Sequence, residues 1–345
     1  MTYRIIHWGL GAMGLGMAKI ITKRPDYQIV GAVDIDPNKL GKDLGELLST
    51  DPIGVKVQQD PAEVIGKTPA EVVLIATESF TREVFDKIML AVNHKLNVIT
   101  IAEEMAYPWA QSPELAAKID TAAKENGVTV LGTGVNPGFV LDTLIIALTG
   151  VCAEVTKIKA ARINDLSPFG PTVMRTQGVG TTPEEFKRGL ENGSIVGHVG
   201  FPESISMIAK ALGVTLDEIR EVREPIISKV YRETPHVKVE PGMVAGCRHS
   251  GYGIKDGKVI IELIHPQQIH PHLEGVETGD YIEIEGTPRI NLKISPEIPG
   301  GIATMAIAVN MVPEVTNARA GLLTMADLPV PRGVFAELQK LTREE

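Results

Sequence analysis

The chain has 345 residues, with 34 basic and 43 acidic residues, a formal charge of −9 and 43% hydrophobic residues. This length predicts two domains, and the hydrophobic content excludes global disorder. The acidic balance, without any Lys/Arg cluster, argues against nucleic acid and anionic membranes as partners. The first residues lack the long apolar stretch of a signal peptide, and Cys152 and Cys247 stand alone. We therefore expect a cytoplasmic protein with reduced cysteines that acts on a small molecule.

The residues up to about 140 alternate between short β-branched runs and amphipathic helical patterns. This alternation is typical of βαβ units, which build a parallel sheet with helices on both faces. We therefore expect an α/β fold whose first domain is a Rossmann-type parallel sheet. The expected strands are 4–8, 28–33, 72–77, 97–102 and 128–131.

The first expected strand runs directly into GLGAMG, which fits the pattern G-x-G-x-x-G. Alone the pattern is weak, but here a strand precedes it, a helical pattern follows, and a second strand closes the unit. The first glycine permits the tight turn, the second lets the backbone approach a pyrophosphate, and the third allows close helix packing. The helix N-terminus then favours the anion. An ordinary glycine turn is the alternative. The expected pyrophosphate-binding residues are Gly9, Gly11, Ala12, Met13 and Gly14.

Asp34 follows the second expected strand, where an acidic side chain accepts hydrogen bonds from the ribose hydroxyls of a dinucleotide. Its carboxylate repels a 2′-phosphate, so we expect NAD rather than NADP, although Lys39 and Lys42 are near enough to allow some NADP binding. Thr77 closes the third strand at the edge where open α/β sheets bind ligands. The alternatives are a turn-forming role for Asp34 before Pro37 and a helix-capping role for Thr77.

Two adjacent glutamates, Glu103 and Glu104, follow the fourth expected strand, at the edge where a nicotinamide would lie. If the strand geometry continued, their side chains would point to opposite faces, so at most one would face a substrate. A glutamate buried in an apolar pocket has a raised pKa, which suits a general acid or base near neutral pH. The alternative is that both are solvated charges or first-turn helix residues.

The fifth expected strand ends in a second glycine-rich turn, 132–139, with the sequence GTGVNPGF. Its glycines would let the backbone pass close to the nicotinamide ribose. Asn136 is expected to hydrogen-bond the cofactor or the substrate. A plain turn between domains uses the same residue types.

From about residue 141 the pattern changes to strand-like runs with turns, which predict an α+β substrate and dimerisation domain with a mixed or antiparallel sheet. The expected strands include 157–163, 259–265 and 281–286, and the expected helices 184–190 and 202–212. The apolar segment 299–311 is expected to return to the first domain as a helix. The predicted domains are 1–140, 141–298 and 299–345.

Four motifs stand out along the chain: 9–14 (GLGAMG), 103–108 (EEMAYP), 132–139 (GTGVNPGF) and 162–171 (RINDLSPFGP). Together they resemble the 2,4-diaminopentanoate dehydrogenases and the related native amine dehydrogenases, which share a nucleotide domain of the dihydrodipicolinate reductase type. The resemblance covers essentially the whole chain, and its later motifs are more specific than the glycine string.

The resemblance implies NAD(P)-dependent oxidative deamination of 2,4-diaminopentanoate to 2-amino-4-oxopentanoate and ammonia, a reversible step of ornithine degradation. In such enzymes a glutamate after the fourth strand does the proton work, which here is Glu103 or Glu104, with Glu103 preferred. Two relatives of this fold differ. Sugar-type oxidoreductases carry Glu-Lys-Pro at this strand end, and dihydrodipicolinate reductases carry a His-His pair and a Lys-x-Asp-x-Pro-Ser-Gly motif. Neither pattern is present in this sequence.

The implied substrate is zwitterionic, so polar residues of the second domain are expected to bind it. Arg162 is the expected clamp for its carboxylate, because a guanidinium pairs with a carboxylate through two hydrogen bonds. A lone His or Gln at a strand end is more often structural. The further substrate positions, chosen mainly from the resemblance, are Asn164, His198, His265, Gln267 and Thr304.

His265, His270 and His272 lie close together in the sequence and raise the question of a metal site. Two prolines break their spacing, and no carboxylate or Cys cluster completes a site, so we expect no metal. Tyr231, His236 and His249 remain unassigned.

Two other functions fit part of the pattern. One is a dehydrogenase for a simpler amine, an amino acid or a hydroxy acid, and the missing lysine disfavours the hydroxy acid. The other is a non-catalytic NAD-sensing module, which would bind the cofactor without turnover. The resemblance also implies a homodimer formed through the sheet of the second domain.

Overall fold

The computed structural model describes residues 2–335. These residues form two compact units: one runs to Phe139 and resumes at Pro299, and the other is Val140–Ile298. Residues 336–345 of the predicted C-terminal segment lie outside the described residues. None of the helices in the described part of the chain is long and apolar enough to cross a membrane.

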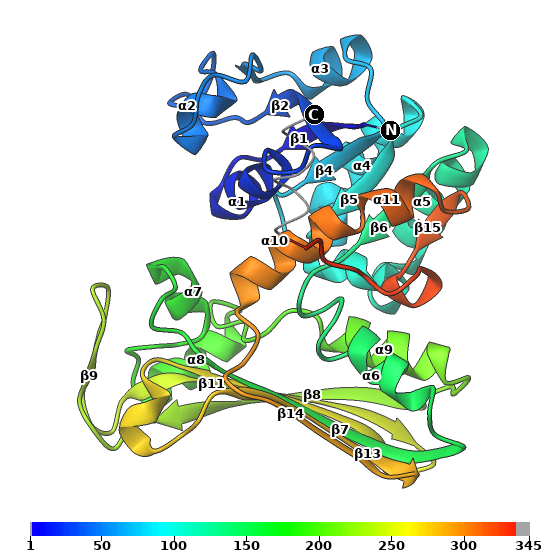
Figure 1. Ribbon diagram of the computed structural model, residues 1–345. Coiled ribbons are helices and arrows are strands. Elements are labelled where there is room, and N and C mark those ends of the chain that lie inside the picture. The colour runs from blue at the N-terminus through cyan, green and yellow to red at the C-terminus, as the bar shows by residue number, and fades with distance from the viewer. Residues whose placement is uncertain (1, 336–345) are drawn as a thin grey trace. The chain divides into compact units, whose positions relative to one another are not determined.

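The first unit is built on a sheet of seven strands, all parallel, in the order β15-β6-β5-β4-β1-β2-β3 (Figure 1). The predicted Rossmann-type parallel sheet is therefore confirmed. Its strands are β1 (Tyr3–Trp8), β2 (Tyr27–Val33), β3 (Val57–Gln58), β4 (Val72–Ile75), β5 (Asn97–Thr100), β6 (Thr129–Gly132) and β15 (Gly321–Leu323).

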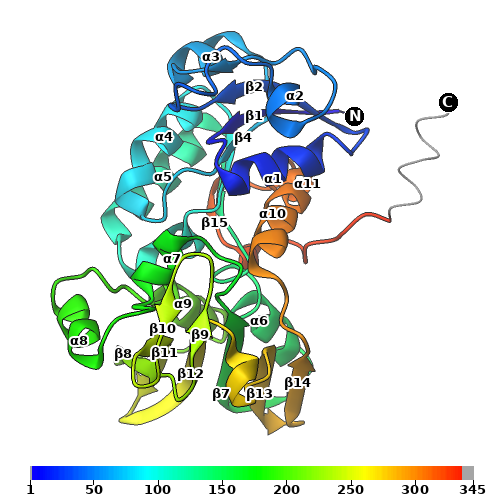
Figure 2. The same cartoon turned by 90° about the vertical axis from the view of Figure 1, so that its left-hand side faces the viewer.

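Helices cover both faces of this sheet, as Figure 2 shows. Because side chains alternate along a strand, Ile5 packs with Met17 and Ile307 in one core, while Ile6 packs with Ile88 and Ile119 in the other. The helices are α1 (Ala12–Ile21), α2 (Leu44–Leu48), α3 (Pro61–Lys67), α4 (Thr81–Asn93), α5 (Pro113–Asn126), α10 (Gly300–Asn310) and α11 (Val312–Thr316), and the 3-10 helices are η1 (Glu103–Ala106), η2 (Pro108–Ala110) and η4 (Met325–Asp327).

The second unit is built on a sheet of six strands in the order β14-β13-β7-β12-β11-β8. β7 and β12 are parallel and the other neighbours antiparallel, so the prediction of a mixed sheet is confirmed. A separate pair of short strands, β9 and β10, accompanies the sheet. The strands are β7 (Glu154–Asp165), β8 (Glu218–Ile227), β9 (Arg232–Glu233), β10 (Lys238–Val239), β11 (Val244–Lys255), β12 (Lys258–Gln268), β13 (Gly279–Thr287) and β14 (Ile290–Ile294).

One face of the mixed sheet carries the helices of this unit (Figure 1). Helix α9 approaches β11 closely because Gly251 and Gly253 lack side chains. A Cβ at Gly251 would lie 3.0 Å from Cβ of Phe201, and a Cβ at Gly253 would lie 2.9 Å from Cγ2 of Ile205. The helices are α6 (Thr143–Thr149), α7 (Pro171–Thr176), α8 (Pro183–Glu191), α9 (Phe201–Ala211) and the 3-10 helix η3 (Pro271–Glu274).

Both cysteines are free, as the sequence predicts. Cys247 lies on β11, and burial raises the pKa of its thiol to about 12, so it remains protonated and unreactive. Cys152 is partly exposed. Neither residue contributes to the site described below.

Candidate active site

The glycine-rich turn between β1 and α1 requires two of its three glycines for its own geometry. Gly9 has a φ of +95°, and a Cβ there would lie 2.5 Å from the carbonyl oxygen of Ala76. A Cβ at Gly14 would lie 1.9 Å from the carbonyl oxygen of Gly9. At Gly11, by contrast, a Cβ would meet no atom of the described residues within 4 Å. The fold does not explain a glycine at position 11, whereas the close approach of a pyrophosphate does.

The N-terminus of α1 is open to an anion. Its N-cap, Gly11, offers no side-chain cap, and no acidic residue lies in its first turn, which begins with Ala12 and Met13. His7 belongs to none of the motifs in the sequence, but its Nε2 lies 2.7 Å from the carbonyl oxygen of Gly14. Burial lowers the pKa of this histidine, so the neutral imidazole holds the start of the helix as a hydrogen-bond donor.

Asp34 follows β2 directly and is held against the glycine turn. Its Oδ2 accepts the N–H of Leu10 at 2.7 Å, its Oδ1 accepts the N–H of Asp36 at 2.8 Å, and Nζ of Lys39 lies 3.2 Å from Oδ2. Burial favours a raised pKa, but the hydrogen bonds from Asp36 and Leu10 and the interaction with Lys39 outweigh it, and the pKa is lowered. The carboxylate is therefore ionised, and Lys39 offsets part of its charge.

The two glutamates after β5 have different surroundings. The 3-10 helix η1 begins at Glu103, so the alternation of a strand does not apply to them. Oε2 of Glu104 accepts the N–H of Thr81 at 2.8 Å and thereby caps the start of α4. Burial raises the pKa of Glu103, and the charge of Glu104 raises it further, against a hydrogen bond with Ser79. These surroundings make Glu103, rather than Glu104, the candidate for a general acid or base.

Three further predicted residues of this unit lie at the carboxyl edge of its sheet. Thr77 is exposed, and its Cγ2 would lie 2.8 Å from a Cβ on Gly9, so it borders the glycine turn. Asn136 lies half-buried in the second glycine-rich turn. Thr304, which the resemblance grouped with residues of the second domain, belongs to α10 in the first unit. Its Oγ1 accepts the N–H of Val135 at 3.0 Å and so holds that turn.

In the second unit, the expected substrate residues begin with Arg162 on β7. Its Nη1 lies 2.6 Å from Oδ1 of Asp280 on β13, and its Nη2 donates to the carbonyl oxygen of Ile298. Both charged side chains are at most 2% exposed. Burial raises the pKa of Asp280, although the charge of Arg162 opposes this shift. The prediction of a free carboxylate clamp is therefore not supported, because a buried ion pair and a carbonyl already occupy the guanidinium fork.

Three buried histidines come together on the same unit. The ring centroids of His198 and His265 are 4.8 Å apart, and those of His198 and His249 are 6.5 Å apart. The backbone N–H of His198 donates to Nδ1 of His249, 3.0 Å away. Outside the trio, Nε2 of His265 lies 2.8 Å from Oδ1 of Asn164, and Nε2 of His249 lies 3.0 Å from Oε1 of Glu221. Four strands and one loop therefore contribute to one polar cluster.

The histidine cluster is neutral at pH 7. Burial lowers the pKa of all three imidazoles, and nearby positive charges lower it further. Arg162 acts in this way on His198 and His265. The cluster therefore offers hydrogen-bond donors and acceptors rather than charge.

Gln267 completes the set of expected substrate residues. It lies two residues after His265 on β12, hence on the same face, and it pairs in register with Asn164 on β7. Its Oε1 is buried and has no hydrogen-bond partner among residues 2–335. This costs about 1–3 kcal/mol unless a ligand or water satisfies it. The structure thus brings Asn164, His198, His265 and Gln267 together and adds His249, which the sequence left unassigned. The pairing of β11 with β12, which places His249 opposite His265, is the signal that was missing.

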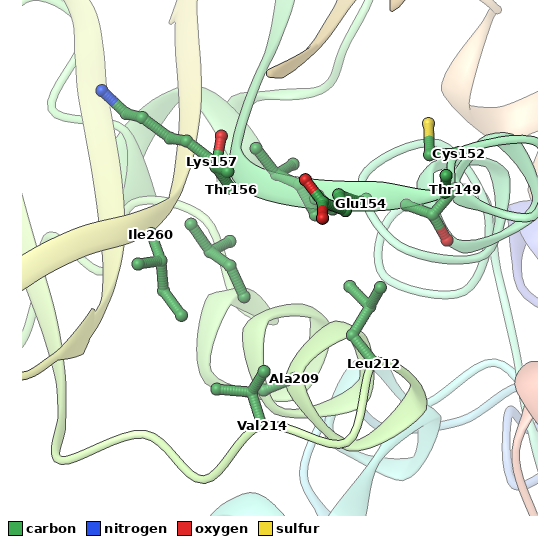
Figure 3. A pocket seen from close by; sticks show the side chains of 13 residues that line it. Thr149, Cys152, Glu154, Thr156, Lys157, Ala209, Leu212, Val214 and Ile260 are labelled. Carbon is green, nitrogen blue, oxygen red and sulfur yellow. The ribbon is translucent and has the colours of Figure 1, made fainter. Parts of the chain in front are cut away.

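A cavity of about 240 Å³ lies elsewhere on this unit (Figure 3). Its wall is formed by the first residues of β7, Glu154 to Ile158, and by apolar side chains that include Leu212 and Val214. The predicted substrate residues lie near the opposite end of β7 and do not line it.

The parallel sheet, the glycine turn at its first crossover and the ionised Asp34 after β2 define a Rossmann-like nucleotide-binding domain, here joined to a mixed-sheet domain as in two-domain oxidoreductases. A family model described as "Dihydrodipicolinate reductase, N-terminus" matches residues 3–101. A second, described as "2,4-diaminopentanoate dehydrogenase C-terminal domain", matches residues 139–344. The chain belongs to the 2,4-diaminopentanoate dehydrogenase family.

Full-length relatives agree with this assignment. A 2,4-diaminopentanoate dehydrogenase of Acetoanaerobium sticklandii is 51% identical over 99% of this chain and 98% of its own length. An amine dehydrogenase of Streptomyces virginiae is 28% identical over 94% of this chain and 95% of its own. The solved structure of an amine dehydrogenase from Mycobacterium smegmatis has a TM-score of 0.85 and 28% identity, and it covers 97% of this chain and 98% of that one. The chain is therefore an enzyme of the amine dehydrogenase class.

Proposed function

We propose that this enzyme oxidatively deaminates 2,4-diaminopentanoate, with NAD as the hydride acceptor, to 2-amino-4-oxopentanoate and ammonia in a reversible reaction. The 51% identical relative supports the substrate. The observation that carries the chemistry is the half-buried Glu103, which has a raised pKa and begins the 3-10 helix η1 just beyond the end of β5. Glu104 is assigned a structural role, because its carboxylate caps α4.

The residues of the first unit fit a dinucleotide. The open space at Gly11 and the uncapped N-terminus of α1 would receive the pyrophosphate, and Asp34 would bind the adenosine ribose. The bound cofactor supplies a hydride acceptor. The ionised carboxylate of Asp34 repels a 2′-phosphate, so NAD is the preferred form. Lys39 offsets part of this repulsion, so NADP is expected to bind more weakly than NAD but not to be excluded.

Glu103 is assigned the proton transfers. The substrate amine must lose a proton before its lone pair can form the C=N bond as the hydride leaves the carbon, and the Glu103 carboxylate accepts that proton. The protonated iminium then takes up water. Glu103 first releases the proton from the ammonium to solvent. It then accepts a proton from the attacking water and returns it to nitrogen, so that ammonia can leave. The sum consumes one neutral amine, one water and one oxidised cofactor, and it gives the ketone, ammonia, the reduced cofactor and one proton.

Substrate recognition is assigned to the polar cluster of the second unit. Asn164, His198 and His265 offer neutral hydrogen-bonding groups, and Oε1 of Gln267 is a buried acceptor that suits the 2-ammonium group. Arg162 is not assigned a direct contact with the substrate, because its guanidinium pairs with Asp280.

The test is NADH formation from 2,4-diaminopentanoate, with product identification and repetition with NADP. A matched panel contains 2-aminopentanoate, which lacks the 4-amino group, and 2-aminopentane, which lacks both the carboxylate and the 2-amino group. Turnover of the diamine acid well above both, with 2-amino-4-oxopentanoate as product, is the expected result. Cofactor binding without turnover of any amine would contradict the proposal.

A second candidate is an amine dehydrogenase for a simpler amine. The similarity to two proteins named amine dehydrogenase favours it, as does the pairing of Arg162 with Asp280, because it occupies the guanidinium that was expected to bind a carboxylate. Faster turnover of 2-aminopentane than of 2,4-diaminopentanoate would select this candidate.

We also propose a homodimer through the face of the mixed sheet that faces away from the helices. Val222 on this face is 38% exposed, and the guanidinium of Arg220 lies 5.4 Å from the ring centroid of Tyr252. Light scattering at several protein concentrations should give twice the mass of one chain, and the mass of a single chain at all concentrations would contradict the dimer.

A further inference from the structure

A second group of polar side chains lies outside the proposed catalytic and substrate residues. Asp165 is the last residue of β7, His270 follows β12, and His272 lies in η3. One ligand atom of each, a carboxylate oxygen or a ring nitrogen, lies within 4.8 Å of the other two. The sequence argued against a metal because no carboxylate accompanied His265, His270 and His272. The tertiary structure directs His265 to the histidine cluster and supplies Asp165 in its place.

We propose that Asp165, His270 and His272 form a binding site for a divalent transition-metal ion, with Zn²⁺ as the best fit. Two imidazoles and one carboxylate suit this ion, and three protein ligands leave a fourth position for water. The site is separate from the proposed dehydrogenase chemistry and does not depend on it.

The carboxylate of Asp165 is oriented by hydrogen bonds to one of its oxygens. Oδ1 accepts the backbone N–H of Ser167 at 2.8 Å, the hydroxyl of Ser167 at 2.5 Å and the backbone N–H of His270 at 3.0 Å. These three bonds saturate Oδ1 and leave Oδ2 for an ion. Such bonds to a ligand carboxylate are the usual second layer of a metal site.

The ring of His270 is oriented as well. Its Nε2 lies 2.8 Å from the carbonyl oxygen of Glu233, so Nε2 carries the proton and Nδ1 keeps its lone pair. The backbone N–H of His270 also donates to the Ser167 hydroxyl at 2.8 Å, which fixes the residue at a φ of +45°. The ring centroid of His272 lies 5.7 Å from that of His270. Because His272 is exposed, an ion can reach the site from solvent.

A bound ion would join the ends of two neighbouring parallel strands. Asp165 follows Asn164 on β7, and His270 comes three residues after Gln267. The ion would therefore fasten the strand ends that carry two of the proposed substrate residues, and its effect is expected on stability rather than on the chemical step.

The test uses the full chain without a histidine tag, after treatment with a chelator. Calorimetric titration with Zn²⁺ should give one ion per chain, and Co²⁺ should give a visible absorption band of a site with nitrogen and oxygen ligands. The midpoint of thermal unfolding should rise with Zn²⁺. His272→Ala should abolish the one-to-one binding without loss of fold, because this side chain is exposed. His236→Ala, at another exposed histidine of the same unit, is the matched control and should bind as the unmodified chain does.

Ser167→Ala tests the orientation of both ligands, because its hydroxyl contacts Asp165 and the N–H of His270. Loss of a second-layer partner is expected to weaken the affinity by about 10–100-fold. Absence of stoichiometric Zn²⁺ or Co²⁺ binding by the unmodified chain would overturn the proposal, and so would unchanged binding by His272→Ala.

Discussion

Replacement of Glu103 by Gln removes the carboxyl group with the raised pKa and keeps the size of the side chain. Proton transfer by one positioned residue contributes about 10²–10⁴-fold to the rate. We therefore expect kcat to fall by this factor, which corresponds to about 2.7–5.4 kcal/mol of transition-state stabilisation. The matched control is Glu104→Gln. Its amide oxygen still accepts the N–H of Thr81, so kcat should stay within a few-fold of the unmodified enzyme.

The pH dependence gives a second, independent measure of the same group. Burial raises the pKa of Glu103 above its ordinary value of 4.5, so the folded protein binds this proton more tightly than the unfolded chain. Its contribution to stability is fully present below pH 4.5 and is lost as the pH rises through the folded pKa. The Gln variant lacks this loss, so its Tm should rise relative to the unmodified enzyme across that window. Because the base must be ionised, kcat/KM should also fall on the acid side of the raised pKa.

The assay is steady-state NADH formation over a range of pH, with calorimetric Tm values for both variants. The acid limb of kcat/KM should disappear in Glu103→Gln together with the loss of kcat. Retention of more than about one tenth of kcat by Glu103→Gln, or an equal loss in Glu104→Gln, would refute the assignment.

Gly11→Ala should fold normally, because its Cβ meets nothing within 4 Å, but bind the cofactor at least about tenfold more weakly in a fluorescence titration. Gly14→Ala, whose Cβ would lie 1.9 Å from a carbonyl oxygen, should instead lower the Tm; equal Tm values would contradict both expectations. Arg162→Ala leaves Asp280 buried and unpaired and should cost about 3–5 kcal/mol in urea denaturation. Arg162→Met with Asp280→Leu should recover most of that loss, and no recovery would argue against the ion pair as its cause. Asp34→Ser removes the charge that repels a 2′-phosphate, so the NADP to NAD ratio of kcat/KM should rise, and an unchanged ratio would show that Asp34 does not select the cofactor.

The fold of the first unit could be read from the sequence because its signals are local. Strands buried on both faces appear as apolar runs, and the glycine pattern that begins at Gly9 leads from the end of a strand into the first turn of a helix. The two strands that the sequence did not reveal, β3 and β15, have only two and three residues. Such short segments become strands because a neighbouring strand pairs with them. They are too short to show a hydrophobic period in the sequence.

The sheet of the second unit was harder to predict from the sequence, because one of its central strands lacks a local strand signal. Its strand β11 contains Gly246, Gly251 and Gly253, which have low strand propensity and are required by a close backbone or by helix α9. Without β11 in its place, His249 could not be grouped with His265. The histidine cluster therefore depends on the register of the sheet rather than on spacing along the chain.

The sequence by itself determined the nucleotide-binding fold, the family and the short set of residues from which a site can be built. The tertiary structure alone gave Glu103 and Glu104 different surroundings, paired Arg162 with Asp280, and brought Asp165 to His270 across 105 positions of the chain. Motifs are local and survive in the sequence, whereas burial, pKa and ion pairing depend on which distant residues become neighbours when the chain folds.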